Sequence, residues 1–124
     1  MENDLPLVQV EVTAKFQRKL RILAKTYRNI SRDIQPVIEE LQAGELPGNQ
    51  IAGIGYTIFK LRVKNSDIQK GKSSGYRLIY YVKTTTKVIL VTIYSKSEQA
   101  DIAPAEIQQI LAEFEQEKEQ ADQG

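Results

Sequence analysis

The side chains that could do chemistry gather between residues 60 and 96, and they are all basic or phenolic. They alternate along three consecutive segments: Lys60, Arg62, Lys64, Arg77, Tyr81, Lys83, Tyr94 and Lys96. Two more cations, Lys70 and Lys72, lie in the stretch that joins the first two segments, and residues 56–66 contain no acid. Cations bind phosphates and tyrosine rings stack on unpaired bases, so this set indicates a surface for single-stranded nucleic acid.

The residue types that are absent narrow the possible chemistry. The chain has no histidine and no cysteine, so it lacks the commonest general acid–base and any zinc site with nitrogen or sulfur ligands. A magnesium-dependent nuclease would need clustered carboxylates, which these segments do not offer. Clustered cations make it easier for any one of them to lose a proton, which would let Lys60 or Lys64 act as a base. We therefore expect neither a metal nor a cofactor.

Charge is distributed unevenly along the chain. Residues 13–97 carry sixteen cations and five acids, a net charge of +11, whereas residues 1–12 carry −3 and residues 98–124 carry −7. A basic body between acidic ends favours a polyanionic partner for the body. The alternative is an ordinary polar surface that faces water.

Three segments that carry the basic residues have the period-two pattern of strands, at residues 56–64, 76–83 and 87–95. Side chains alternate between the faces of a strand, so Phe59, Leu61 and Val63 should face the core and Lys60 and Arg62 the opposite side. On the next strand the same rule places Arg77, Tyr81 and Lys83 beside the basic row. The three residues 84–86 between the last two strands suit a hairpin.

The remaining segments predict the elements that must support these strands. A strand is expected over residues 7–12 and a helix after Thr13, followed by a second helix with Pro36 in its first turn. The glycine-rich residues 44–55 indicate a loop, and Pro104 opens a last helix before an acidic, frayed tail at about 116–124. The predicted fold is a single α+β domain over residues 1–124, with a core at about 5–115. Its order is β-α-α-β-β-β-α, with an antiparallel sheet on two N-terminal helices and a basic open face.

Composition also bears on location. No apolar run approaches the roughly 18 residues of a membrane span, and the first residues are acidic where a signal peptide would be basic. We therefore expect a cytoplasmic protein without a membrane partner.

Three parts of the basic segments carry a resemblance to a known family. Residues 59–64 (FKLRVK) and 70–80 (KGKSSGYRLIY), together with 93–98 (IYSKSE), resemble the catalytic core of the RelE/ParE toxin superfamily, and look closest to its HigB-like branch. The order of strands and helices agrees over about residues 5–115. The resemblance implies the toxin of a type II toxin–antitoxin system that enters the ribosomal A site and cleaves mRNA, with a cognate antitoxin as its other partner.

The resemblance also implies roles for individual residues. Lys60 and Arg62 would bind phosphate and activate the attacking 2′-hydroxyl group, and Arg77 would stabilise charge on the scissile phosphate. Lys64 and Lys96 would be supporting cations. RelE itself has an arginine and a tyrosine at positions that correspond here to about Ser97 and Ala103. Lys96 is the candidate to replace the arginine, and Tyr81 or Tyr94 the tyrosine.

Two other functions are compatible with the same resemblance. One is a ParE-like inhibitor of DNA gyrase, although the set of Lys60, Arg62 and Arg77 favours the nuclease. The other is a non-catalytic RNA-binding or regulatory protein on the same scaffold, because the tyrosine of RelE is missing from its usual position.

Overall fold

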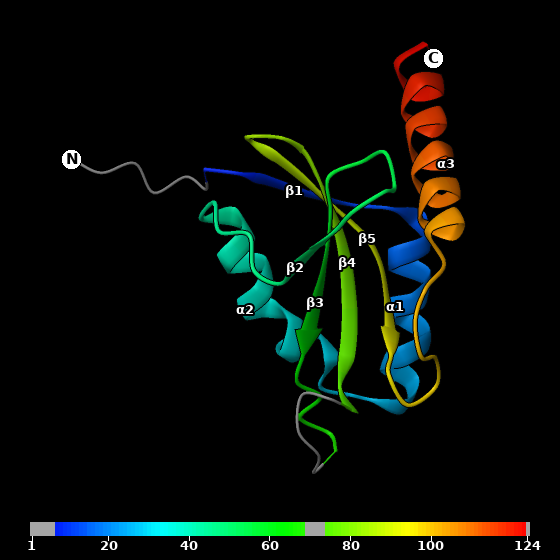
Figure 1. The fold of residues 1–124 in the computed structure, drawn as a ribbon. Helices are drawn as coiled ribbons and strands as arrows, with labels where there is room; N and C mark the ends of the chain where they lie inside the picture. Colours follow the sequence, from blue (N-terminus) through cyan, green and yellow to red (C-terminus); the bar gives the residue numbers. More distant parts are fainter. Residues whose placement is uncertain (1–6, 69–73, 124) are drawn as a thin grey trace, which may run out of the picture.

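The computed structural model describes residues 7–68 and 74–123, and it shows one five-stranded sheet with helices on both faces (Figure 1). The elements, in chain order, are β1 (Gln9–Val12), α1 (Ala14–Thr26), α2 (Ile30–Gln42), β2 (Asn49–Ile51), β3 (Ile58–Val63), β4 (Tyr76–Thr84), β5 (Lys87–Ser95) and α3 (Pro104–Gln123). The strand order is β1-β5-β4-β3-β2. β1 runs parallel to β5, and all other neighbours are antiparallel.

The predicted α+β class is confirmed, with two additions to the sheet. A short edge strand, β2, lies within the segment predicted as a loop and pairs with β3. Its three residues are too few for a period-two pattern to show in the sequence. The sheet is also mixed and not wholly antiparallel, because two helices separate β1 from the hairpin and return the chain in the parallel sense.

The first hydrophobic core lies between the sheet and the helices α1 and α2. As predicted, Phe59, Leu61 and Val63 of β3 point into it, as do alternate residues of β4 such as Tyr76 and Leu78. Thr13 caps α1, since its hydroxyl accepts a hydrogen bond from the amide of Phe16 at 2.9 Å. The same hydroxyl donates to the carbonyl of Val91 at 2.7 Å, so the helix cap is tied directly to β5.

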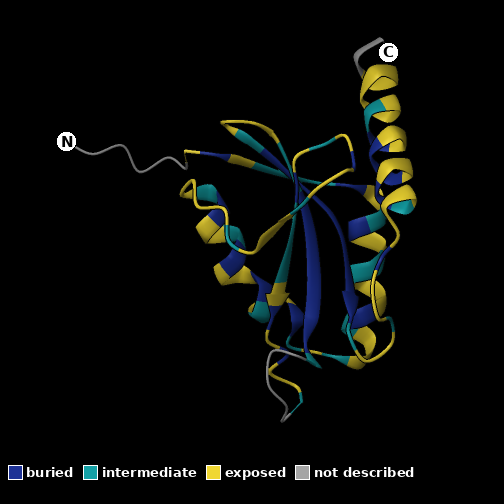
Figure 2. Cartoon of the chain, in the orientation of Figure 1, coloured by how far each residue is buried: buried dark blue, intermediate teal, exposed yellow. Residues whose placement is uncertain are grey.

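A second hydrophobic core covers much of the sheet face that was predicted to be open. It joins Ile58, Ile79 and Val91 on the strands to Ile107 and Leu111 on α3. Figure 2 shows the result, with β4 and β5 buried along most of their length. The part of this face near Lys60, Arg62 and Arg77 forms an accessible pocket, whereas the second core covers the part that lies against α3 and Ile54. Figure 1 shows α3 standing beside the sheet at that side.

Two helix predictions need correction. Pro36 is the seventh residue of α2 and not in its first turn, because the helix begins at Ile30, where packing of Ile30 and Ile34 in the core offsets the lost hydrogen bond. The acidic residues 116–123 are not frayed but continue α3 to Gln123. Lys118 anchors this end by an ion pair of 3.1 Å with Glu11, which also pairs with Lys87 at 3.2 Å. No helix in the described part of the chain is both long and apolar enough to cross a membrane.

Candidate functional site

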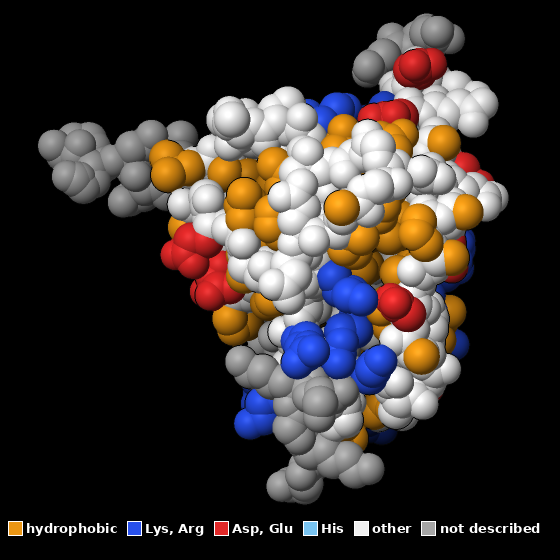
Figure 3. All heavy atoms as spheres, viewed as in Figure 1, with side chains coloured by type: hydrophobic (Ala, Val, Ile, Leu, Met, Phe, Trp, Pro, Cys, Tyr) orange, Lys and Arg blue, Asp and Glu red, His pale blue; other side chains and the backbone are white. Residues whose placement is uncertain are grey.

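The accessible part of the sheet face forms a pocket of about 670 Å³, which we call the basic groove. Figure 3 shows it as a cluster of cations on the front surface with an acidic side chain beside it. It is lined by side chains from β3, β4 and the loop after β5, and by the start of β2: Gly48, Asn49, Lys60, Leu61, Arg62, Arg77, Lys96, Ala100 and Asp101.

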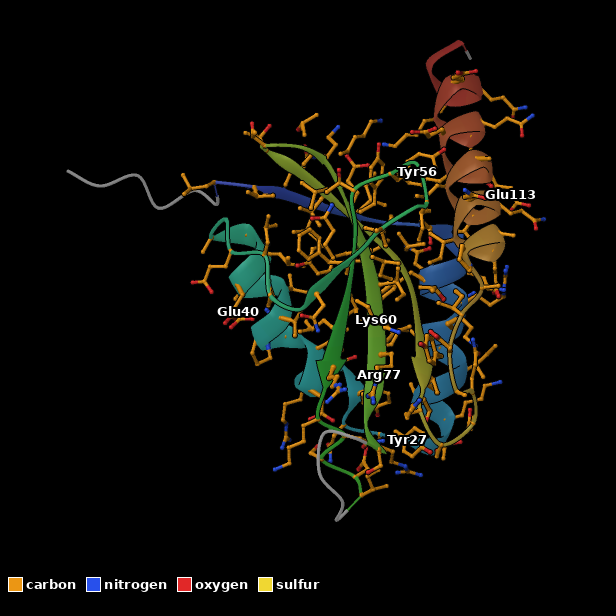
Figure 4. All side chains as sticks on the ribbon, in the orientation of Figure 1. Tyr27, Glu40, Tyr56, Lys60, Arg77 and Glu113 are labelled. Carbon is orange, nitrogen blue, oxygen red and sulfur yellow. The ribbon has the colours of Figure 1, made fainter. Side chains whose placement is uncertain are left out.

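Strand register brings the cations of the groove together. Arg62 on β3 lies directly opposite Arg77 on β4, and Arg77 in turn lies opposite Tyr94 on β5. Lys60 is two residues from Arg62 on the same face of β3, as alternation requires. Figure 4 shows Lys60 and Arg77 close together over the sheet, with Tyr56 near α3 towards its other end.

Arg77 is the buried cation of the groove, with only 6 % of its surface exposed. Its guanidinium donates a hydrogen bond to the carbonyl of Tyr76 at 3.2 Å. A buried arginine is restricted in its rotamers, so its charge is held at one place on the groove floor. Arg62, by contrast, is exposed.

Lys60 is linked across the groove to an acid that the sequence analysis did not single out. Its ammonium group donates to Oδ1 of Asp101 at 3.1 Å, and the two side chains are 34 % and 67 % exposed. No spacing rule could have identified Asp101, because it lies 41 residues from Lys60, in the loop between β5 and α3.

The same oxygen of Asp101 has two further donors. The backbone amide of Ile102 donates to Oδ1 at 2.8 Å, and the hydroxyl of Tyr94 does so at 3.4 Å. The hydrogen bond from Ile102 and the bond from Lys60 hold the pKa of the Asp101 carboxyl below its usual range, because both stabilise the charged form. Asp101 is therefore a carboxylate at neutral pH.

Tyr94 is joined to the groove lining through its hydroxyl, which donates to Asp101, while the side chain is 2 % exposed and belongs to the second core. Burial raises the pKa of Tyr94 to about 12, and the charge and hydrogen bond of Asp101 act in the same direction, against the charge of Arg77. The phenol thus stays protonated throughout the neutral range and acts as a hydrogen-bond donor.

The loop that carries Asp101 is held by its own hydrogen bonds. The ammonium group of Lys96 donates to the carbonyl of Ala100 at 2.8 Å, and the amide side chain of Gln99 donates to the carbonyl of Asp101 at 2.9 Å. Ile102, with 8 % of its surface exposed, anchors the end of the loop in the second core. Lys96 thus both lines the groove and supports the loop.

Other residues from the sequence analysis lie outside the groove lining. Lys64 is exposed beyond the end of β3, and Lys83 is exposed near the hairpin end of β4. Tyr81 packs edge-on against Tyr56, with ring centroids 5.1 Å apart, at the margin of the second core. Lys70 and Lys72 lie outside the described residues.

Within residues 7–68 and 74–123, no three acidic side chains come together in a way that could hold a metal ion. Comparison with known families matches residues 12–122 to the RelE toxin of the RelE/RelB toxin–antitoxin system. No curated protein matches the chain. The match spans every element from α1 to the last turn of α3, and includes the whole basic groove.

Proposed function

The chain belongs to the RelE toxin family, and from this membership we propose that it is an endoribonuclease that cleaves ribosome-bound mRNA in the basic groove. Membership of a RelE/RelB system implies a cognate antitoxin as partner. Toxins of this family are typically endoribonucleases, so the class of reaction follows the family. Assignment to the HigB-like branch remains a prediction from the sequence.

The observation that carries the proposal is the convergence of four cations in one groove: Lys60, Arg62, Arg77 and Lys96. Two of them lie on β3, one lies on β4 and one lies in the loop after β5, and they meet on the part of the sheet face that the second core leaves open. Arg62 and Arg77 face each other on neighbouring strands, where like charges repel and lower the stability of the fold. A contribution to stability therefore does not explain why both are present. A phosphodiester backbone would supply the missing negative charge.

RNA carries its own nucleophile, the 2′-hydroxyl group, so the protein has to orient the chain and stabilise charge. We assign Arg77 to the scissile phosphate because its guanidinium is buried and held in place. Arg62 and Lys60, which are more exposed, would bind phosphate oxygens on either side. Lys96 would add a further positive charge at the edge of the groove.

The test uses Arg62→Ala, because Arg62 is exposed and its loss should leave the fold intact. Lys83→Ala removes another exposed cation, from outside the groove, and serves as the matched control. Each variant is induced in a bacterium, and mRNA ends are mapped in translated and untranslated transcripts. We expect codon-phased cuts only in translated RNA, reduced about 100-fold by Arg62→Ala and unchanged by Lys83→Ala.

Other outcomes would replace the proposal. Growth arrest with intact mRNA and blocked DNA supercoiling would identify a ParE-like gyrase inhibitor. A folded wild-type protein that neither arrests growth nor cuts mRNA would identify a non-catalytic RNA-binding protein.

A further inference from the structure

The proposed reaction requires a group that removes the proton of the attacking 2′-hydroxyl. From the sequence, Lys60 or Lys64 is the expected base. In the structure the ammonium group of Lys60 already acts as a hydrogen-bond donor to Asp101, and Lys64 lies outside the groove. Asp101 is the one carboxylate that lines the groove in the described part of the chain.

The hydrogen bonds of Asp101 orient its carboxylate. The donors from Lys60, Tyr94 and Ile102 all converge on Oδ1. Within the described residues, Oδ2 receives no hydrogen bond, and the side chain is 67 % exposed. A carboxylate that is anchored through one oxygen presents the other, in a fixed orientation, to whatever enters the groove.

The anchor is also rigid, which argues against an acid that simply swings aside when RNA binds. Asp101 is followed directly by Ile102, which is buried in the second core, and the loop before it is closed by the bonds of Lys96 and Gln99. The hydrogen bond from the backbone amide of Ile102 to Oδ1 joins neighbouring residues, so it holds the Asp101 side chain against its own backbone. The carboxylate therefore keeps its place relative to Lys60 and Tyr94.

The negative charge of Asp101 weakens the binding of RNA phosphates in the groove. Arg62, Arg77, Lys60 and Lys96 surround it, but a phosphate that enters the groove is repelled by Asp101, by about 1 kcal/mol for charges 4 Å apart in water. A groove that only bound RNA would do so better with a neutral residue here. The carboxylate is thus accounted for by chemistry and not by affinity.

We propose that Asp101 is the catalytic base of this nuclease, an inference that rests on the proposed function. Oδ2 takes the proton of the 2′-hydroxyl, and the electron pair of that O–H bond forms the new bond from the 2′-oxygen to phosphorus. The bond from phosphorus to the 5′-oxygen breaks, and the leaving oxygen takes a proton from water at the open side of the groove. The products are a 2′,3′-cyclic phosphate and a 5′-hydroxyl end, and Asp101 returns its proton to solvent.

The partners of Asp101 then act through it as positioning residues. Lys60 and the amide of Ile102 hold the carboxylate and favour its charged form, which lowers its pKa. Base activity should accordingly stay constant from neutral pH down to about pH 5, above the usual Asp value of about 3.9. Tyr94 completes the anchor from β5.

The experiment uses translating bacterial ribosomes programmed with a short labelled mRNA, and measures single-turnover cleavage by the full-length protein. Asp101→Asn keeps the shape and removes the base, while Asp101→Glu retains a carboxylate. Glu98→Gln removes the same charge from an exposed position in the same loop and is the matched control. Affinity is measured separately with an mRNA that carries a 2′-deoxy sugar at the cleavage position.

We expect Asp101→Asn to lower the cleavage rate by about 100-fold to 10,000-fold, with equal or tighter binding of the 2′-deoxy mRNA. Its remaining rate should rise about tenfold per pH unit between pH 6 and 8, because hydroxide replaces the lost base, whereas the wild-type rate is flat. Asp101→Glu should restore part of the rate, and Glu98→Gln should match the wild type.

Three results would overturn the inference. If the wild type cleaves and Asp101→Asn cleaves within about threefold of it, Asp101 is not the base, and the proposed function stands. If Asp101→Asn weakens binding and keeps the flat pH profile, Asp101 is structural only. If the wild type leaves the mRNA intact, the proposed function and this inference both fail.

Discussion

At the level of single residues, the phenol of Tyr94 joins the second core to the basic groove. Its ring is buried among the aliphatic side chains of the sheet and α3, and its hydroxyl donates to Asp101. The proton is needed for that bond, since a phenolate beside a carboxylate would be repelled. Ionisation of Tyr94 should therefore be linked to stability at alkaline pH.

We predict that Tyr94→Phe reduces the loss of stability between pH 10 and pH 12. The pKa of Tyr94 is raised to about 12 in the folded protein, above the unfolded value of about 10. The contribution of this group to stability is therefore complete below pH 10 and is lost as the pH rises towards 12, by roughly 2 kcal/mol. Urea unfolding at a series of pH values between 10 and 12 measures the free energy of unfolding of both proteins.

The control for this prediction is the wild type, measured over the same pH range. Tyr76 and Tyr80 are also buried and have raised pKa values, so they contribute equally to the loss of stability at alkaline pH in both proteins. Identical alkaline profiles for wild type and Tyr94→Phe would show that the hydroxyl of Tyr94 is not coupled to folding.

At the level of elements, the edge strand β2 depends on a close approach of two backbones. Gly48 has φ +96, and a Cβ added there would lie 2.5 Å from the carbonyl oxygen of Lys60 on β3. A side chain at this position would thus push β2 away from β3 at the wall of the basic groove. Gly53 has a similar φ of +81 but faces open space. A substitution at Gly53 therefore causes backbone strain alone, whereas a substitution at Gly48 causes the same strain and a steric clash.

We predict that Gly48→Ala destabilises the protein more than Gly53→Ala. Both substitutions place a side chain in the left-handed region, at about 1–2 kcal/mol. Only Gly48→Ala adds the clash with β3, which should raise its total to about 2–4 kcal/mol. Urea midpoints measure the difference, and hydrogen exchange at residues 49–51 should show faster exchange in Gly48→Ala alone. Equal midpoints would mean that β2 adapts without cost.

At the level of the whole molecule, one sheet carries a hydrophobic core on each face. Leu41 of α2 is fully buried in the first core, and Leu111 of α3 is fully buried in the second. Strands β3, β4 and β5 contribute alternate residues to both cores. Loss of packing on one face should therefore weaken the same strands that support the other.

We predict that Leu41→Ala and Leu111→Ala each lower stability by about 2–5 kcal/mol, with a single unfolding transition and an unchanged urea m-value. Urea unfolding followed by circular dichroism and by tyrosine fluorescence measures the transition with two independent signals. Gln116→Ala, at an exposed position of α3, is the control and should leave the midpoint within about 0.5 kcal/mol of the wild type. Two transitions in Leu111→Ala would show that α3 unfolds independently of the sheet.

Much of this arrangement is predictable from local patterns. Alternation along residues 56–64 and 76–83 determines which side chains share a face, and it placed Lys60, Arg62 and Arg77 together. Thr13 and Pro104 marked the starts of α1 and α3. These features are determined by residues that are close together in the chain, so they can be predicted from the sequence alone.

Other features depend on contacts between distant segments. The sequence determined by itself a basic strand face without histidine, cysteine or clustered acids, because residue type and strand period are local properties. Only the tertiary structure decided how much of that face is open, since the second core, which joins Ile79 and Val91 on the strands to Leu111 on α3, covers part of it. It also brought Asp101 to Lys60 across 41 residues, through a loop that is held by the burial of Ile102 and by the hydrogen bonds of Lys96 and Gln99.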